Sequence, residues 1–273
     1  MDKIPHTDPE YPYKKFTMRL LFRDLRFRGG TAKAGDRLPT FALLTTEGEP
    51  TSIEDLAGGK PVLLIFGSLT CPMTASAVPI LKTLYREYSE RVEFVMVNVR
   101  EAHPGEHYPQ PETLEEKLAH ARELARFYAM PWPVVSDDID GNLHRSLDPK
   151  PNSAFLINVD GVIVFRSLWA SDQSALHPAL ERAANGERPA QSESTAMMGP
   201  VSRAMGQVHE VMERAGPQAV SDLWWGAFPM ALAGRLATVF SGSLPDQRGI
   251  YAVLALALLF IIIVASIGAW AFD

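Results

Sequence analysis

Two apolar runs dominate the first half of the chain. Residues 61–66 (PVLLIF) and 92–99 (VEFVMVNV) are largely continuous in apolar side chains, which is typical of β-strands covered on both faces of a sheet. Residues 75–88 and 113–128 instead repeat apolar side chains at helical spacing. The pattern therefore predicts buried strands that alternate with helices.

The second part of the pattern is a hairpin followed by a helix. Residues 153–167 (SAFLINVDGVIVFRS) form two β-branched and aromatic runs joined through Asp160 and Gly161, a strong hairpin signal. A short strand is predicted at WPVVSD before the hairpin, and a helix over residues 174–184 after it. The resulting order β-α-β-α-β-β-α, with parallel strands first and the hairpin last, predicts an α/β, thioredoxin-like domain over residues 35–186.

The C-terminal end has a different character. Residues 250–272 carry no charged side chain, and at 1.5 Å per residue they extend roughly 35 Å, enough for a hydrocarbon layer of ~30 Å. A buried core helix is the alternative, although such helices rarely run so long without a polar face. Tyr251 and Trp270 suit the two membrane interfaces. We predict one transmembrane anchor over residues 249–273.

Basic residues near the span predict its orientation. Arg235 and Arg248 precede it and only Asp273 follows it, so the positive-inside rule favours a cytoplasmic α/β domain. The start of the chain, MDKIPHTDPEYPY, lacks the apolar core of a signal peptide. Both observations predict a single-pass membrane protein whose bulk is cytoplasmic.

Two further segments flank the predicted domain. Residues 1–34 include the basic and apolar stretch YKKFTMRLLFRDLRFR, which fits either a segment on a membrane or partner surface or a helix packed on the domain with a solvated basic face. Residues 187–248 begin as a linker and continue as amphipathic helices. Within them, residues 224–240 are apolar but interrupted by Pro229 and Arg235, which fits an interfacial helix, two short helices or a second span.

Composition narrows the possible functions. The formal net charge is −6, which argues against a dedicated nucleic-acid-binding protein. A single cysteine excludes an internal disulfide and a cysteine-cluster metal site. The histidines show no ligand spacing, so neither a metal nor a bound cofactor is predicted.

The single cysteine lies at a chemically special position. Cys71 follows the apolar run 61–66, and Pro72 suits the first position of a helix. A thiol there faces unsatisfied backbone N–H groups and the positive end of the helix dipole, so we expect its pKa to fall below the free value of about 8.5. The alternative is a structural apolar side chain. Thr74 stands where a C-x-x-C oxidoreductase has its second cysteine, so an external thiol would have to restore Cys71.

Two motifs carry a resemblance to a known family. FGSLTCP, followed after the next strand by VREAHPGE, resembles the iodothyronine deiodinase family and its bacterial redoxin relatives. The resemblance implies that Cys71 stands at the position of the catalytic selenium or sulfur, with Thr70 before it. Glu101 and His103 match the second motif, and the resemblance implies that its histidine takes part in the chemistry. Pro151 precedes a strand where thioredoxin-like folds often place a cis proline beside the active thiol.

The resemblance covers residues 35–169 and includes departures. Leu69 stands where deiodinases carry an extra cysteine, Pro111 stands where they have a second histidine, and sulfur replaces selenium. These differences argue against thyroid-hormone deiodination. SLTCPMT also resembles the cysteine-x-x-threonine turn of glutathione-peroxidase-like proteins, which implies that peroxide reduction is a possible activity.

His103 is the candidate acid or base. Parallel strands end at the same edge of a sheet, so residues 100–103 are expected to lie near Cys71. A histidine within reach could deprotonate the thiol or protonate a leaving group. The alternative is a loop histidine that hydrogen-bonds Glu101 or the backbone.

The sequence therefore favours a membrane-anchored, one-cysteine thiol oxidoreductase. Cys71 would reduce a peroxide or a disulfide and would be recycled by an external thiol or redox partner. The alternative is a non-catalytic, redoxin-fold accessory subunit of a larger membrane complex, docked through the N-terminal segment and the C-terminal helices. The expected partners include the lipid bilayer and exclude nucleic acid.

Overall fold

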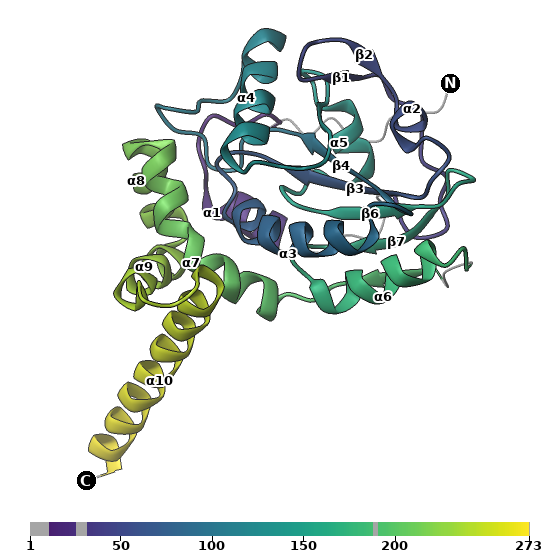
Figure 1. Cartoon of the computed structure of the whole chain (residues 1–273). Helices are drawn as coiled ribbons and strands as arrows, with labels where there is room; N and C mark the ends of the chain where they lie inside the picture. The colour runs from purple at the N-terminus through teal and green to yellow at the C-terminus, as the bar shows by residue number, and fades with distance from the viewer. Residues whose placement is uncertain (1–10, 26–31, 188–190, 273) are drawn as a thin grey trace.

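The computed structural model describes residues 11–25, 32–187 and 191–272. In these ranges one mixed sheet has the strand order β2-β1-β5-β4-β3-β6-β7-β8 (Figure 1). Strands β3, β4 and β5 are parallel, whereas β6 is antiparallel to both β3 and β7. The predicted thioredoxin-like α/β fold is confirmed. The strands are β1 (Leu43–Thr45), β2 (Pro50–Thr51), β3 (Val62–Gly67), β4 (Glu93–Asn98), β5 (Val134–Ser136), β6 (Ala154–Ile157), β7 (Ile163–Ser167) and β8 (Ser192–Ser194).

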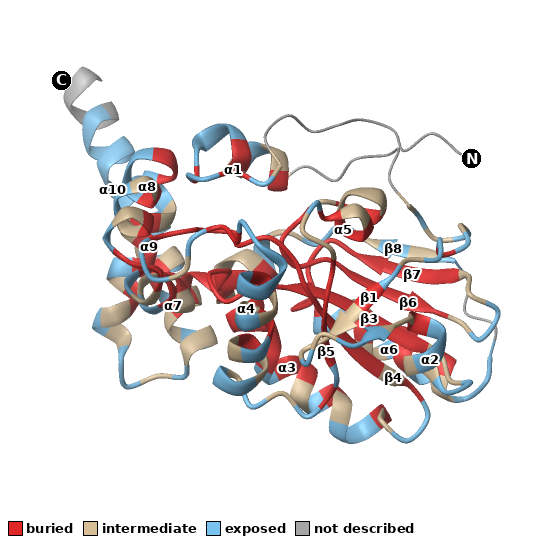
Figure 2. Ribbon diagram, turned by 90° about the horizontal axis from the view of Figure 1, so that it is seen from above, coloured by how far each residue is buried: buried red, intermediate tan, exposed pale blue. Residues whose placement is uncertain are grey.

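Helices cover both faces of this sheet (Figure 2). Successive residues of a strand point to opposite faces, so Leu63 and Ile65 join one core while Leu64 and Phe66 join the other. The first core is closed by α3, α4 and α6, and the second by α2 and α5. These helices are α2 (Ile53–Ala57), α3 (Pro72–Tyr88), α4 (Leu114–Phe127), α5 (Asn142–Leu147) and α6 (Gln173–Ala184).

The C-terminal helices pack on the sheet domain. The helix α7 lies against α3, and both α9 and α10 pack against α7. At the crossing of α7 and α10, a Cβ atom on Gly206 or on Gly249 would collide with the backbone of the other helix. Arg248 donates to the Gly206 carbonyl at 3.0 Å and to the Glu210 carboxylate at 2.6 Å. The base of α10 is therefore fixed to the domain. The four helices are α7 (Met198–Ala215), α8 (Pro217–Gly226), α9 (Phe228–Ala237) and α10 (Pro245–Phe272).

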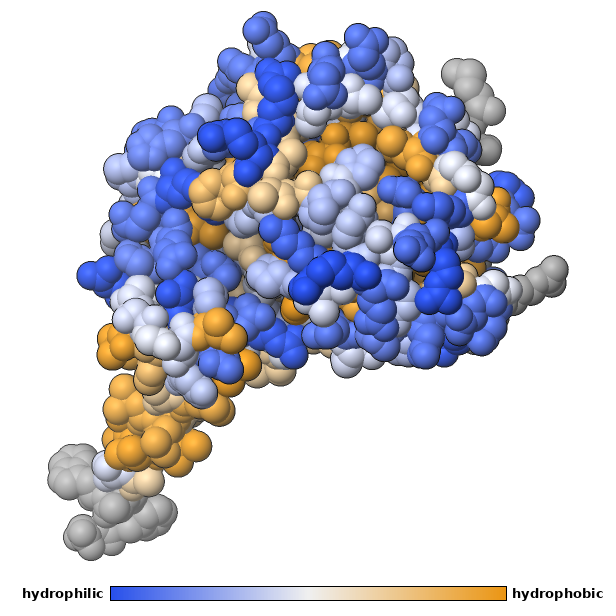
Figure 3. Space-filling model, in the orientation of Figure 1, coloured by the Kyte–Doolittle hydropathy of each residue, from blue (hydrophilic) through white to orange (hydrophobic). Residues whose placement is uncertain are grey.

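Helix α10 projects from the body as an apolar rod (Figure 3). In the described part of the chain it is the one helix that is long and apolar enough to cross a membrane, over Pro245–Ile267, and 6% of its apolar window is buried. This exposure contradicts the alternative of a buried core helix. The segment 224–240 is not one long helix, because α8 and α9 have 10 residues each and extend only about 15 Å.

The N-terminal segment forms a short helix, α1 (Met18–Asp24), which packs on the body near α8. Its Leu20 and Asp24 side chains are buried, while Met18 and Phe22 are about half exposed. Helix α1 is thus packed on the domain, whereas residues 1–10 and 26–31 of the predicted segment lie outside the described residues. The exposed face of α1 is apolar as well as basic.

The helix crossing at Gly206 gives a prediction for stability. Gly206→Ala places a methyl group against the Pro245 backbone, so α10 must move away from α7. We expect the free energy of unfolding of the full chain in detergent to fall by about 1–3 kcal/mol, as for other overpacked sites. The matched control is Gly199→Ala in the same helix, where a Cβ atom meets nothing within 4 Å. Equal stabilities of the two variants would contradict the tight crossing.

Candidate thiol site at the start of helix α3

Cys71 lies where β3 gives way to α3. It is the N-cap residue of the helix, and its Sγ accepts a hydrogen bond from the Thr74 backbone N–H at 3.4 Å. Pro72 occupies the first turn, where a missing N–H leaves no donor unsatisfied. The predicted placement between a buried strand and a helix start is therefore confirmed.

The environment of the thiol opposes ionisation. Cys71 is 1% exposed, and burial raises the pKa of its thiol to about 11, although hydrogen bonds from Thr74 and Met73 act in the opposite direction. The expectation of a lowered pKa is therefore wrong for this conformation. Loss of hydration outweighs the helix terminus, and the thiol is protonated at neutral pH.

Glu101 joins the two sequence motifs. The Thr70 amide and hydroxyl donate to one Glu101 carboxylate oxygen at 2.9 and 2.6 Å, and the His103 amide donates to the Thr70 hydroxyl oxygen at 3.1 Å. The second carboxylate oxygen lies 3.0 Å from His120 Nδ1. Glu101 is fully buried, so it holds the Cys71 turn and the His103 loop together rather than facing a substrate.

His103 lies beside the thiol in a shared cavity. Its ring centroid is 4.2 Å from that of Phe16, and in the described structure its buried Nδ1 has no hydrogen-bond partner. Burial, and then the Arg100 charge, lower the pKa of His103 to about 3. The alternative in which His103 bonds Glu101 is wrong, because His120 makes that contact.

Cys71 and His103 are both neutral in this conformation. Transfer of the thiol proton to the imidazole is opposed by the difference between the two pKa values, about 11 for Cys71 and about 3 for His103. This difference corresponds to a free energy on the order of 10 kcal/mol. The closed site therefore does not hold a thiolate–imidazolium pair. Such a pair requires water or a polar ligand at the sulfur.

Thr74 and Pro151 have different surroundings. The Thr74 hydroxyl lies 3.4 Å from the Ser68 amide and 3.5 Å from the Asn152 side-chain nitrogen, so it fixes the turn beneath the sulfur. Pro151 lines the cavity, but the cis peptide bond recorded among the described residues is Tyr11–Pro12. The expectation of a cis proline at Pro151 is therefore wrong.

The cavity beside Cys71 is small and mostly apolar. Its volume is about 50 Å³. Helices α1, α7 and α9 supply a large part of its wall, and no pattern in the sequence indicates that these distant segments meet over the thiol. The lining side chains are Phe16, Leu21, Asp24, Leu25, Cys71, Pro72, Met73, Ala102, His103, Pro151, Trp169, Val201, Ala204, Met205 and Met230.

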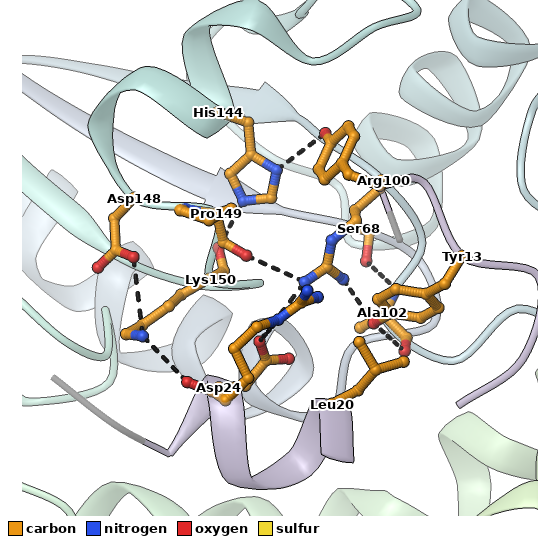
Figure 4. A network of polar contacts seen from close by, with 12 residues as sticks. Tyr13, Leu20, Asp24, Ser68, Arg100, Ala102, His144, Asp148, Pro149 and Lys150 are labelled. Atoms are coloured by element: carbon orange, nitrogen blue, oxygen red, sulfur yellow. Dashed lines mark hydrogen bonds and ion pairs between the residues drawn. The ribbon is translucent and has the colours of Figure 1, made fainter. Parts of the chain in front are cut away.

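Helices α1, α7 and α9, with the segment that leads into α1, form a cover over Cys71. Arg100 fixes the N-terminal part of this cover (Figure 4). Its buried guanidinium donates to the Tyr13 hydroxyl at 2.5 Å and the Pro149 carbonyl at 3.0 Å, and lies 3.5 Å from the Asp24 carboxylate. The Tyr13 hydroxyl donates in turn to the Ala102 carbonyl at 2.8 Å. The segment that leads into α1 is therefore bonded to the loop that carries His103.

The C-terminal helices are bonded to the same region. Arg214 of α7 donates to the Leu69 carbonyl at 3.1 Å, two residues before Cys71. The Glu106 carboxylate accepts a hydrogen bond from the backbone N–H of Gln218 at the start of α8. The backbone N–H of His107 donates to the Ala215 carbonyl at 3.0 Å. The loop that follows His103 thus holds the junction of α7 and α8.

The comparisons with known proteins agree with this architecture. A family model described as Redoxin matches residues 33–182, more than half of the chain. The chain belongs to the redoxin family. A solved structure of an uncharacterized conserved protein from Geobacillus kaustophilus has a similar fold, with a TM-score of 0.50 at 18% identity over 60% of this chain and 89% of that one.

Two curated relatives of this redoxin have related sequences. Type II iodothyronine deiodinase of Fundulus heteroclitus is 27% identical over 119 residues, which are 38% of this chain and 45% of the relative. Thioredoxin-like protein YneN of Bacillus subtilis is 28% identical over 129 residues, which are 47% of this chain and 68% of the relative. The redoxin thus spans less than half the length of the deiodinase that it matches.

The site offers a thiol and an imidazole rather than a metal centre. In the ranges that the structure covers, no group of three or more His, Cys, Asp or Glu side chains is placed to hold a metal ion. The groups available for chemistry at the cavity are the Cys71 sulfur and His103 Nδ1. The carboxylate of Asp24, also at the cavity, is paired with Arg100.

The Glu101 bonds give a prediction for the site. Glu101→Gln replaces one acceptor oxygen by an amide NH₂, which meets donors from Thr70 or His120. We expect the free energy of unfolding to fall by about 1.5–3 kcal/mol, as for a buried hydrogen bond to a charged group. The exposed Glu115→Gln in α4 is the control and should change stability by less than about 0.5 kcal/mol. Denaturant titration of both variants measures the free energy of unfolding. Similar losses in both would disprove that Glu101 holds the Cys71 turn and the His103 loop together.

Proposed function

We propose that this redoxin is a membrane-anchored, one-cysteine thiol oxidoreductase in which Cys71 reduces a peroxide or a disulfide. The observation that supports this best is the position of the sulfur. It accepts a backbone N–H at the start of α3 and shares a cavity with the unpartnered Nδ1 of His103. Both groups are suited to stabilise a thiolate once the cavity admits a polar ligand.

The proposed cycle begins with attack of the Cys71 sulfur on a peroxide. An S–O bond forms and the O–O bond breaks, so sulfur becomes a sulfenic acid and the leaving oxygen receives the thiol proton. His103 carries that proton during the step. A first external thiol then condenses with the sulfenic acid and releases water, and a second thiol frees Cys71 and leaves as a disulfide.

The described conformation represents the resting state of this cycle. The thiol is neutral, and Phe16 lies on His103. Helix α1 is held through Asp24 and Arg100 at the rim of the sheet domain. A movement of α1 admits the oxidant and raises the polarity around the sulfur, which lowers the thiol pKa.

Helix α10 is the proposed anchor. Its exposed apolar surface follows the part of the helix that packs against α7 and α9. The helix is long and apolar enough to cross a bilayer. Arg235 and Arg248 at its N-terminal side favour a cytoplasmic position for the redoxin domain. An external cytoplasmic thiol then serves as the reductant.

The cover over Cys71 favours a second candidate, a non-catalytic subunit of a membrane complex. A buried, neutral thiol is also what a purely structural cysteine would show. The exposed apolar side chains on α8 and α9, among them Trp225 and Phe228, would then contact a protein partner. Extraction of the protein in mild detergent followed by a native gel separates the two candidates. Migration within a stable larger complex supports the accessory subunit, whereas migration as a monomer argues against it.

A turnover assay tests the proposed function. The full chain in liposomes should consume peroxide or a disulfide in the presence of a small thiol, and Cys71→Ser should abolish this because no other cysteine is present. Phe16→Ala should increase the initial rate several-fold by loosening the cover over His103. Val159→Ala, at an exposed turn, is the control. The absence of turnover in both the unmodified chain and Phe16→Ala would refute the enzyme and leave the accessory subunit.

A further inference from the structure

The apolar cluster that contains Cys71 is continuous with the proposed membrane anchor. Met73 and Trp169 belong to this cluster, together with buried side chains of α1, α7, α8 and α9. Val253 and Leu256, which lie in α10, pack against its outer side. Apolar contacts therefore connect the surroundings of the thiol with the first turns of the helix that would enter the bilayer.

The rim of the Cys71 cavity shows from which side a ligand can come. Four of its lining side chains are partly exposed, and all the others are buried. The four are Leu21 of α1, Leu25 directly after α1, Val201 of α7 and Met230 of α9. The opening is therefore apolar, and it lies among the helices next to α10 rather than over the loops of the sheet domain.

The surface around this opening is also apolar. Gly226, at the end of α8, contacts the backbone at Thr17 and Met18 so closely that a Cβ atom would lie 3.2 Å from the Met18 nitrogen. Met18 and Phe22 of α1 and Phe228 of α9 are each more than half exposed. Helix α1 thus adjoins the α8–α9 corner, and both present apolar side chains beside the anchor, as membrane-interface segments do.

The cavity itself accepts only a small polar group. Its volume of about 50 Å³ is well below the ~150 Å³ of an apolar cavity that holds benzene. It therefore has room for a peroxide group and the adjoining carbon but not for a long chain. The unpartnered His103 Nδ1 is the polar atom available to bond that group, and the rest of the ligand must lie along the apolar rim.

We propose that the substrate of Cys71 is a hydroperoxide carried on an acyl chain, which reaches the thiol from the bilayer through the opening between α1, α7 and α9. This deepens the proposed function and rests on it. The sulfur takes the terminal peroxide oxygen and becomes a sulfenic acid, and the acyl hydroperoxide leaves as the alcohol with the thiol proton. The external thiol of the proposed cycle then reduces the sulfenic acid.

The experiment compares two oxidants on the full chain in liposomes. Phosphatidylcholine hydroperoxide or hydrogen peroxide is added at equal bulk concentration, and Cys71 sulfenic acid is trapped with dimedone and quantified by mass spectrometry. We expect the lipid hydroperoxide to react at least about tenfold faster, because its acyl chain holds it in the bilayer beside the rim, where its effective concentration exceeds that of hydrogen peroxide in the bulk water.

A matched pair of rim variants tests the access route. Met230→Gln makes the rim polar at similar length, whereas Met230→Leu keeps it apolar. Met230→Gln should slow oxidation by the lipid hydroperoxide about tenfold and oxidation by hydrogen peroxide by clearly less, because only the acyl chain must lie along this side chain and the amide must lose water to contact it. Met230→Leu should keep the preference for the lipid hydroperoxide. Val159→Gln, at an exposed turn outside the cavity lining, is the control and should match the unmodified chain for both oxidants.

The outcomes separate this inference from the proposed function. Equal or faster oxidation by hydrogen peroxide, or an equal effect of Met230→Gln on both oxidants, would overturn the bilayer route while Cys71 remains a reactive thiol. Failure of both oxidants and of a soluble disulfide to modify Cys71 would overturn the proposed function as well.

Discussion

The burial of one sulfur atom is the constraint on which the chemistry of this redoxin depends. Cys71 sits at a helix start that offers it a backbone N–H, an arrangement that stabilises a thiolate. Helices α1 and α7 nevertheless close over it, and loss of hydration raises its pKa to about 11, because removing water from a charged sulfur costs more than the hydrogen bonds from Thr74 and Met73 return. The helix start thus favours the thiolate, whereas the helices that cover the sulfur keep the thiol neutral.

The cover is connected to the site by polar contacts rather than by packing alone. Arg100 joins Tyr13 and Asp24 of the N-terminal segment to the His103 loop, and Arg214 joins α7 to the residue before Thr70. Glu101 fixes the Cys71 turn to that loop. Under the proposed function, a movement of α1 away from Arg100 would change the polarity around the sulfur and switch the thiol between a resting and a reactive state.

The sequence predicted the sheet domain well because its signals are local. The continuous apolar runs became β3 and β4, the Asp160–Gly161 turn became the β6–β7 hairpin, and Cys71 falls at the helix start. It failed where contacts join distant segments. The thiol pKa depends on α1 and α7, Glu101 bonds His120 and not His103, and Pro151 follows a trans bond. No periodicity or spacing encodes which helices close over a cavity, so the cover could only be seen in three dimensions.

The cover, and not the intrinsic chemistry of the turn, keeps the thiol neutral. The most direct measurement is the rate of Cys71 alkylation by iodoacetamide as a function of pH, on the full chain in liposomes and on a variant with Leu21 and Leu25 both changed to Ala. We expect an apparent pKa well above 8.5 for the unmodified chain and a clearly lower value for the variant. An apparent pKa at or below 8.5 in the unmodified chain, or the same value in both proteins, would show that the cover does not control the thiol.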